Sequence, residues 1–233
     1  MSARRDEWVS LPTAWIEAGG LKKFKWASAG GHRVAALMVL MVIAHHADQD
    51  DGVAKVTYDA LGDATGLSRV VISAALTLLI KRGLIRRPEG GGRSALQLVD
   101  FDRTVAGWGK LPFRGLYAGR TIPGFSAFRL RSIVELDALK IYLLFVARRN
   151  NKTNYVNITY DGIEDRTGIA RERIRSALTL LAACNMVHID HVKSTTNDYG
   201  LANAYRLVHL DPYRHMGTTG RGSEAIDFVD IFE

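Results

Sequence analysis

The sequence predicts a mainly α-helical protein with small β-hairpins, of the α+β class, built from two copies of one unit. The string TYDALGDATGLSR begins at Thr57 and TYDGIEDRTGIAR begins at Thr159, an offset of 159 − 57 = 102. The offset holds without a gap from residues 36–79 to residues 138–181. Both copies then continue into two short stretches with strand character. A repeat of this kind identifies the folding unit, here roughly a hundred residues used twice.

Each copy opens with a long apolar segment. Residues 34–47 are apolar nearly all round, and residues 136–149 keep the same apolar face with more charge outside it. This pattern predicts a buried helix at the centre of each unit. A polar connector follows in both copies, and then a candidate short strand at residues 54–56 and 156–158.

A second, short helix is predicted to begin after Thr57, whose hydroxyl can accept hydrogen bonds from free helix amides. Asp59 lies in its first turn, where the helix dipole favours negative charge. Gly66 readily takes the left-handed conformation that ends a helix and redirects the chain. The second copy repeats these positions at Thr159, Asp161 and Gly168.

A third helix is predicted from Ser68, as its N-cap, to about Arg82. In the second copy Ala170 replaces that serine, so the helix loses its side-chain cap, at a cost of about 1 kcal/mol. Gly83 and Asn185 follow the two third helices, and both residue types adopt left-handed backbone easily. The geometry is therefore expected to be the same in both copies.

Each copy ends in a predicted hairpin. The strand-like stretches are residues 84–88 and 94–100 in the first copy, and residues 186–192 and 204–210 in the second. Loop tips vary most freely, and the second tip is longer.

This order of elements resembles the winged helix-turn-helix family. The turns DATGLSR and DRTGIAR closely resemble that family's junction between its second and third helices, and the resemblance covers residues 36–102 and 138–211. We therefore expect two tandem winged helix-turn-helix domains, at residues 1–101 and 102–213, followed by a flexible acidic-aromatic tail at residues 214–233.

A weaker echo precedes each unit: WVSLP at Trp8 and WGKLP at Trp108. We expect each of these arms to belong to its repeat unit and to pack against the core. Their tryptophans are interpreted as packing groups instead of a nucleic-acid stacking platform.

The resemblance implies that the third helix enters the DNA major groove. If Ile72, Leu76 and Leu79 face the core, helical spacing turns the opposite face outward. That face carries Arg69, Val70, Ser73, Ala74 and Thr77 in the first copy, and Arg171, Glu172, Arg175, Ser176 and Thr179 in the second, with Arg173 beside them.

The two outward faces are not equal. The second carries Arg171 and Arg175 one turn apart, and arginine binds guanine through two hydrogen bonds and also holds phosphate. The second helix is therefore expected to bind DNA more strongly, while the first binds it weakly or contacts protein. Glu172 either accepts a hydrogen bond from cytosine or pairs with a neighbouring arginine. For the arginines the alternative interpretation is an ordinary solvated helix surface.

The resemblance also implies that the hairpin wings lie along the DNA backbone or the minor groove. The matching basic residues neutralise phosphates and add affinity without sequence preference. They are Arg86, Arg87 and Arg93 in the first unit, and Lys193 beside the polar tip 194–203 in the second. An ordinary exposed hairpin is the alternative.

Paired winged helices with a more basic second unit look like the replication initiators of plasmids and related mobile elements. That resemblance implies direct-repeat binding by the second domain, with dimerisation or control through the first. A transcriptional repressor with the same contacts is the first alternative, and a winged-helix scaffold that docks proteins is the second. The expected partner is double-stranded DNA, with self-association and a replication or transcription protein as further partners.

Composition supports a binding protein. Net charge is +7 with a pI near 9.6, which favours an anionic partner without identifying it. No phosphate loop, nucleophile elbow or Cys/His cluster at metal spacing is present in the sequence, so we expect neither an enzyme nor a cofactor. The one cysteine, Cys184, is expected to be a buried, inert thiol.

No apolar run reaches the roughly 20 residues that span a bilayer, and no leader is evident, so we expect a cytoplasmic protein associated with nucleoid or plasmid DNA. The tail is interpreted as a disordered terminus or as a peptide that docks on a partner protein. In the second case the docking residues are Phe228, Val229, Ile231 and Phe232.

Overall fold

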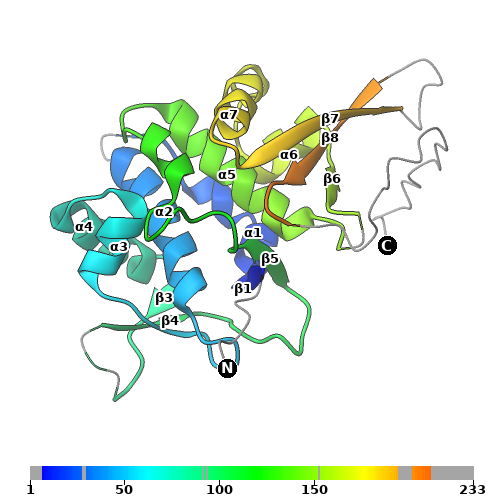
Figure 1. Ribbon diagram of the computed structural model, residues 1–233. Helices are drawn as coiled ribbons and strands as arrows, with labels where there is room; N and C mark the ends of the chain where they lie inside the picture. Colours follow the sequence, from blue (N-terminus) through cyan, green and yellow to red (C-terminus); the bar gives the residue numbers. More distant parts are fainter. Residues whose placement is uncertain are drawn as a thin grey trace.

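The computed structural model describes residues 7–27, 30–90, 92, 94–151, 153–193 and 201–210, with the backbone alone at 191–193 and 201–203. Two sets of elements repeat in the same order (Figure 1). The first core comprises α2 (Gly30–His46), β2 (Val53–Lys55), α3 (Tyr58–Thr65), α4 (Arg69–Lys81), β3 (Ile85–Arg86) and β4 (Ala95–Leu98). The second core comprises α5 (Ile133–Arg148), β6 (Tyr155–Asn157), α6 (Tyr160–Thr167), α7 (Arg171–Ala183), β7 (Val187–Lys193) and β8 (Leu201–Leu207).

Each core carries a small antiparallel sheet of three strands. The orders are β2-β4-β3 and β6-β8-β7, so the predicted short strand joins the hairpin in both copies. The mixed α+β class predicted from the sequence is confirmed.

Helix ends follow the expected local chemistry. Thr57 Oγ1 accepts from the Ala60 amide at 3.1 Å, and Thr159 Oγ1 accepts from the Gly162 amide at 3.1 Å. Ser68 caps α4, whereas Ala170 supplies no side-chain cap to α7, as predicted. The residues that end the second and third helices all have positive φ: Gly66 and Gly168, then Gly83 and Asn185.

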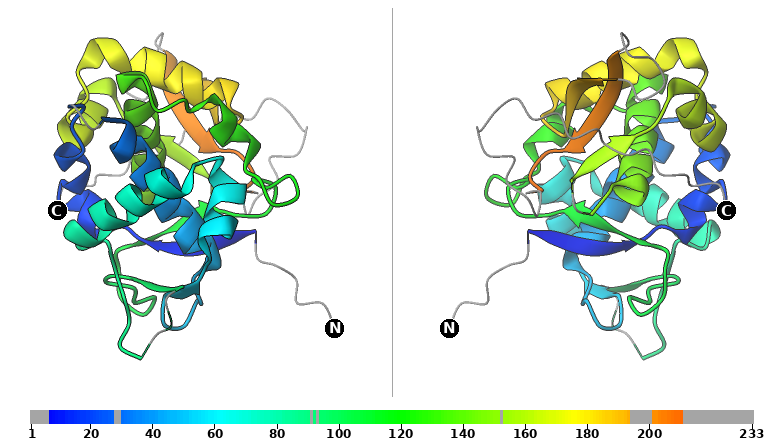
Figure 2. Two further views of the ribbon diagram at one scale, coloured as in Figure 1. Left: turned by 90° about the vertical axis from the view of Figure 1, so that its left-hand side faces the viewer. Right: turned by 90° about the vertical axis from the view of Figure 1, so that its right-hand side faces the viewer.

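Helices α2 and α5 form the centre of the molecule (Figures 1 and 2). Residues 34–44 of α2 are all buried, because α2 packs against α3 and α4 on its own side and against α5 across the centre. A helix enclosed in this way has no solvent face, which explains why it is apolar nearly all round.

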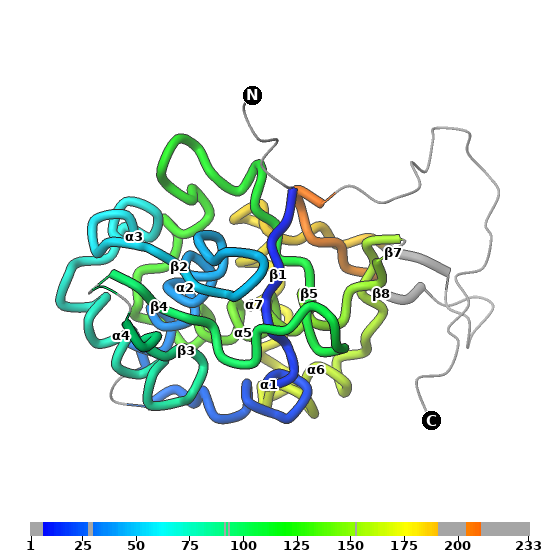
Figure 3. The backbone as a smooth tube through the Cα atoms, turned by 90° about the horizontal axis from the view of Figure 1, so that it is seen from below, coloured from blue at the N-terminus to red at the C-terminus, as the bar shows by residue number. Residues whose placement is uncertain are grey.

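Two arms precede the cores, and the strand in each pairs with the other. β1 (Trp8–Pro12) runs antiparallel to β5 (Trp108–Pro112), and the two lie side by side (Figure 3). The Trp8 and Trp108 rings stack with centroids 5.8 Å apart and an interplanar angle of 15°. Both tryptophans are half-buried, and Trp8 also packs against the hydrophobic core.

The rest of each arm reaches the opposite core, which was not expected, although the first arm also contacts its own core, where Arg82 Nη2 donates to the Lys23 carbonyl at 2.7 Å. In the first arm, α1 (Ala14–Glu17) contacts α5, and η1 (Gly20–Lys23) contacts α6. In the second arm, which includes η2 (Pro123–Ala127), the Ile122 amide donates to the Ala64 carbonyl of α3 at 3.1 Å. The arms therefore join the two cores, and each does not simply extend its own.

Candidate nucleic-acid interface

Helix α7 presents an exposed polar face directly after the turn at Gly168. Ile174, Leu178 and Leu181 are buried, so the opposite face of α7 points to solvent. The outward residues are all exposed, as the spacing predicted: Arg171, Glu172, Arg175, Ser176 and Thr179. Arg175 makes no ion pair with any residue that the structure describes, so its guanidinium has its full set of donors for an external acceptor.

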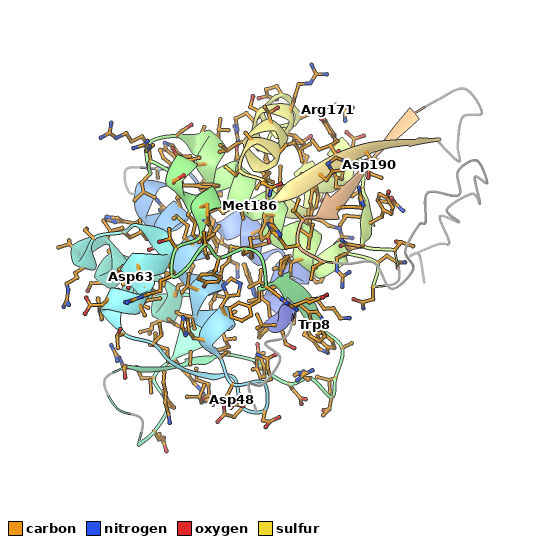
Figure 4. The ribbon with its side chains drawn as sticks, in the orientation of Figure 1. Trp8, Asp48, Asp63, Arg171, Met186 and Asp190 are labelled. Carbon is orange, nitrogen blue, oxygen red and sulfur yellow. The ribbon has the colours of Figure 1, made fainter. Side chains whose placement is uncertain are left out.

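Arg171 stands at the N-terminus of α7 and projects from the surface (Figure 4). Its guanidinium forms an ion pair with Asp161 in the first turn of α6 and lies 5.8 Å from the Tyr160 ring centroid. The arginine side chain is still 59% exposed. An exposed pair of this kind contributes little stability, so the guanidinium can exchange the carboxylate for a phosphate or a base at small cost.

The first arginine of α4, Arg69, also forms an ion pair with an aspartate in the first turn of the preceding helix. Arg69 Nη2 lies 2.7 Å from Asp59 Oδ1, with side chains 72% and 68% exposed. The next outward positions differ from those of α7, because Val70 is 79% exposed and is followed by Ser73 and Ala74. Thr77 lies on the same face, and its hydroxyl donates to the Ser73 carbonyl at 2.9 Å. Unlike α7, this face carries no arginine beyond its first residue.

Arg173 faces the interior of the second core and is not part of the exposed face. Its Nε lies 2.8 Å from Oδ2 of Asp137 on α5, a carboxylate whose side chain is 2% exposed. Lys140, also buried on α5, lies near this pair. Burial lowers the pKa of Lys140 to about 8, an effect that Asp137 opposes and Arg173 reinforces. The ion pair between Arg173 and Asp137 joins α7 to α5 on the side of α7 away from its exposed face.

The wing of the first core carries two described arginines, both exposed. Arg86 on β3 donates from Nε to Oε1 of Gln97 at 2.9 Å. Arg87 lines a groove of ≈ 460 Å³ that runs between the wing and the start of α4, with Asp59, Arg69 and Ser94. The groove therefore connects the first arginine of α4 to the wing.

The remaining predicted positions are not fully described. Arg93 and the tail residues Phe228, Val229, Ile231 and Phe232 lie outside the described residues, as does tip 194–200. Lys193 ends β7, where the backbone alone is described.

The sequence interpretation missed the carboxylate partners of the two leading arginines. Asp59 and Asp161 were assigned to the helix dipole alone. The signal was present, because both aspartates precede an arginine by ten residues: 69 − 59 = 10 and 171 − 161 = 10. This repeated spacing across a helix, a turn and the next helix start brings the two side chains together.

Residues 33–94 match the MarR family, so the first core carries a MarR-family winged-helix DNA-binding domain. The match covers α2 (from Arg33), β2, α3, α4 and β3. A search of the curated proteins found no match to this chain. The family consists of DNA-binding transcriptional regulators that bind double-stranded DNA and usually dimerise. It therefore favours the transcriptional alternative over replication initiation, and a binding protein over an enzyme.

The described part of the chain also bears on metal binding and on membrane insertion. No group of three or more His, Cys, Asp or Glu residues there is placed to hold a metal ion. No single described helix is long and apolar enough to cross a membrane; α3 and α4 reach that length only together, bent by 102°. Cys184 is half-buried, and burial raises the pKa of its thiol.

Proposed function

We propose that this chain regulates transcription by binding double-stranded DNA sequence-specifically through two tandem winged helices, at residues 1–101 and 102–213. The observation that carries the proposal is the exposure of Arg171 and Arg175 on α7, the helix that follows a turn matching the one in the MarR-family core. A helix in that position meets base edges in the major groove.

The second winged helix is supported by the repetition of local geometry. Helices α3 and α6 have the same threonine N-cap, and the turns that follow them have the same left-handed glycine. The strand order β6-β8-β7 repeats β2-β4-β3. Helix α7 therefore stands in its core as α4 does in the core that matches the family.

The two helices are proposed to contribute unequally. Arg175 can form two hydrogen bonds with guanine, whereas Ser73, at the equivalent position 175 − 102 = 73, forms weaker and less selective contacts. We assign the main base-specific contacts to α7 and weaker contacts to α4, through Arg69, Ser73 and Thr77. In α7 the contact set is Arg171, Glu172, Arg175, Ser176 and Thr179.

The wings are proposed to hold phosphates through Arg86, Arg87, Arg93 and Lys193. Arg93→Ala should weaken binding to all duplex sequences similarly and reduce the slope of log affinity against log salt by about one unit. Anisotropy titrations of specific and scrambled duplexes at several salt concentrations measure this. A loss confined to the specific duplex would assign Arg93 to base recognition instead.

The proposed function is tested by selecting bound fragments from genomic DNA at a fixed salt concentration and placing the selected sequence upstream of a reporter. Sequence-specific enrichment and repression by the wild-type protein are expected. Enrichment without any effect on the reporter would leave DNA binding intact and contradict the regulatory role.

Replication initiation on a plasmid or other mobile element is a second candidate, supported by the tandem layout with a more basic second unit. Loss of plasmid maintenance on deletion of the protein, with reporter expression unchanged, would favour it. A protein-docking scaffold is disfavoured because the outward face of α7 carries two arginines instead of an apolar or acidic surface. Binding of a partner protein by the tail stays a prediction.

A further inference from the structure

The arms meet through contacts that occur twice in exchanged form. The Thr13 amide donates to the Gly107 carbonyl at 2.6 Å, and the Phe113 amide donates to the Glu7 carbonyl at 2.8 Å. The donor of the second bond lies 100 positions after the donor of the first, 113 − 13 = 100, whereas its acceptor lies 100 positions before the acceptor of the first, 107 − 7 = 100. The bonds from Ala14 and Arg114 to the same two carbonyls repeat the exchange, at 3.1 and 3.2 Å.

The contacts between arms and cores are exchanged as well. Lys22 of the first arm pairs with Asp165 of the second core, at 3.4 Å. Arg120 of the second arm pairs with Asp63 of the first core, and 165 − 63 = 102. At the centre, α2 packs against its own counterpart α5.

These exchanged contacts indicate a two-fold rotation between the two halves of the chain. In a two-fold arrangement, a patch A of the first half contacts a patch B of the second half, and patch A of the second half contacts patch B of the first. The exchanged contacts of the arms and cores have this form, so a two-fold rotation relates the two halves. A translation along the chain axis would instead give head-to-tail contacts, with each arm used differently. The two halves of this chain are therefore arranged like the two subunits of a symmetric dimer.

The same rotation exchanges α4 and α7. Two helices related in this way meet a duplex in opposite orientations and contact half-sites that are inverted with respect to each other. Resting on the proposed function, we infer that a single chain binds an inverted repeat with unequal halves. This differs from the direct repeats that a resemblance to replication initiators implies.

The expected inequality of the halves follows from the outward faces. Arg69 and Thr77 of α4 have identical counterparts in α7, so the half-sites should share the bases that these types contact. The positions between them differ, because Val70, Ser73 and Ala74 of α4 correspond to Glu172, Arg175 and Ser176 of α7. The half-site bound by α7 should therefore be the better defined.

The test uses the full-length wild-type protein and the half-site obtained by selection. Duplexes carry one half-site, two inverted half-sites or two direct half-sites, with centre spacings around one helical turn, about 10 base pairs. One inverted spacing should bind at least about tenfold more tightly than a single half-site, because the second contact is intramolecular. Sedimentation of that complex should give one chain per duplex.

A gain-of-function variant adds a second measurement. Ser73→Arg gives α4 the residue that α7 has at the equivalent position. It should raise affinity for an inverted repeat of two α7 half-sites by about tenfold over wild type, and leave a single half-site nearly unchanged. Ser73→Ala is the matched control and should give no gain.

Three outcomes overturn the inference while leaving the proposed function intact. They are equal affinity for one and two half-sites, preference for direct repeats, and two chains on each inverted site. Absence of any sequence preference on every duplex would instead contradict the proposed function itself.

Discussion

The two cores share a backbone plan but differ in what joins their central and outward helices. In the second core, Asp137, Lys140 and Arg173 form a partly buried group of charges between α5 and α7. The equivalent positions of the first core, 102 residues earlier, are Ala35, Met38 and Val71. At these equivalent positions, α5 and α7 are joined by an ion pair, whereas α2 and α4 carry apolar side chains.

The residues that differ at positions 71 and 173 lie on the same helices as the outward residues, α4 and α7. Arg173 fixes α7 from the interior while Arg171 and Arg175 face solvent on the same helix. In α4, Val71 packs partly buried while the neighbouring Val70 is exposed. The comparison indicates that a duplicated backbone keeps its geometry while its two copies take different chemistry, and the more charged copy is the one that we assign to base recognition.

The largest effect is expected from removing the carboxylate of the charged group. Asp137→Ala leaves Arg173 and Lys140 without their counter-charge, and loss of one partner of a buried pair costs about 3 kcal/mol in the free energy of unfolding. Urea denaturation measures this. The triple variant Asp137→Ala/Lys140→Met/Arg173→Val recreates the first core's residues and should recover most of the loss. Failure of the triple variant to recover would show that the two cores are not interchangeable here.

The next effect is a pH dependence of the free energy of unfolding, which comes from Lys140 of the second core and has no counterpart at Met38 of the first. The pKa of Lys140 is lowered by burial from 10.5 to about 8, so in this range the unfolded chain binds more protons than the folded one. The lysine's destabilising contribution is therefore fully present below pH 8 and is relieved as the pH rises towards 10.5. Relative to Lys140→Met, wild-type stability should increase between pH 8 and 10. A constant difference between the two proteins would contradict the lowered pKa.

The outward faces are compared by Arg175→Ala and Ser73→Ala. Arg175→Ala should weaken binding to the selected duplex by about 1 to 3 kcal/mol and relax the preference at one base pair. Ser73→Ala should have a smaller effect on both. Competition titrations against single-base variants of the duplex measure affinity and preference together. Equal losses on every sequence would remove Arg175 from base recognition.

The smallest expected difference concerns the N-caps of the outward helices. Ala170→Ser gives α7 the side-chain cap that Ser68 provides to α4, and should stabilise the protein by about 0.5 to 1 kcal/mol. Ser68→Ala should destabilise it by a similar amount. Thermal unfolding of the two variants measures both changes. A destabilising Ala170→Ser would mean that the α7 amides already have another partner.

Local features could be predicted from the sequence because local chemistry decides them. The 102-residue offset, the capping threonines and the glycines at Gly66 and Gly168 identified the helices, their ends and the outward residues. The exposure of Arg171 and Arg175 followed from helical spacing alone.

Contacts between distant segments were harder to predict. The repeat of WVSLP and WGKLP indicated two arms, but it contained no information on which core each arm would contact. Lys22 reaches Asp165 across the molecule, and Arg173 reaches Asp137 from another helix, and neither pairing follows from spacing. The all-round apolar character of residues 34–44 was the available clue that α2 would be covered on several sides.

The central claim is that α7 is the stronger of two DNA-contacting helices. It is tested most directly by comparing Arg171→Ala/Arg175→Ala with Arg69→Ala/Ser73→Ala in anisotropy titrations of the selected duplex at one salt concentration. Unfolding measurements on both variants establish that each remains folded. The first variant should lose at least about tenfold more affinity than the second. Equal affinities for the two variants, or a larger loss for the second, would contradict the account.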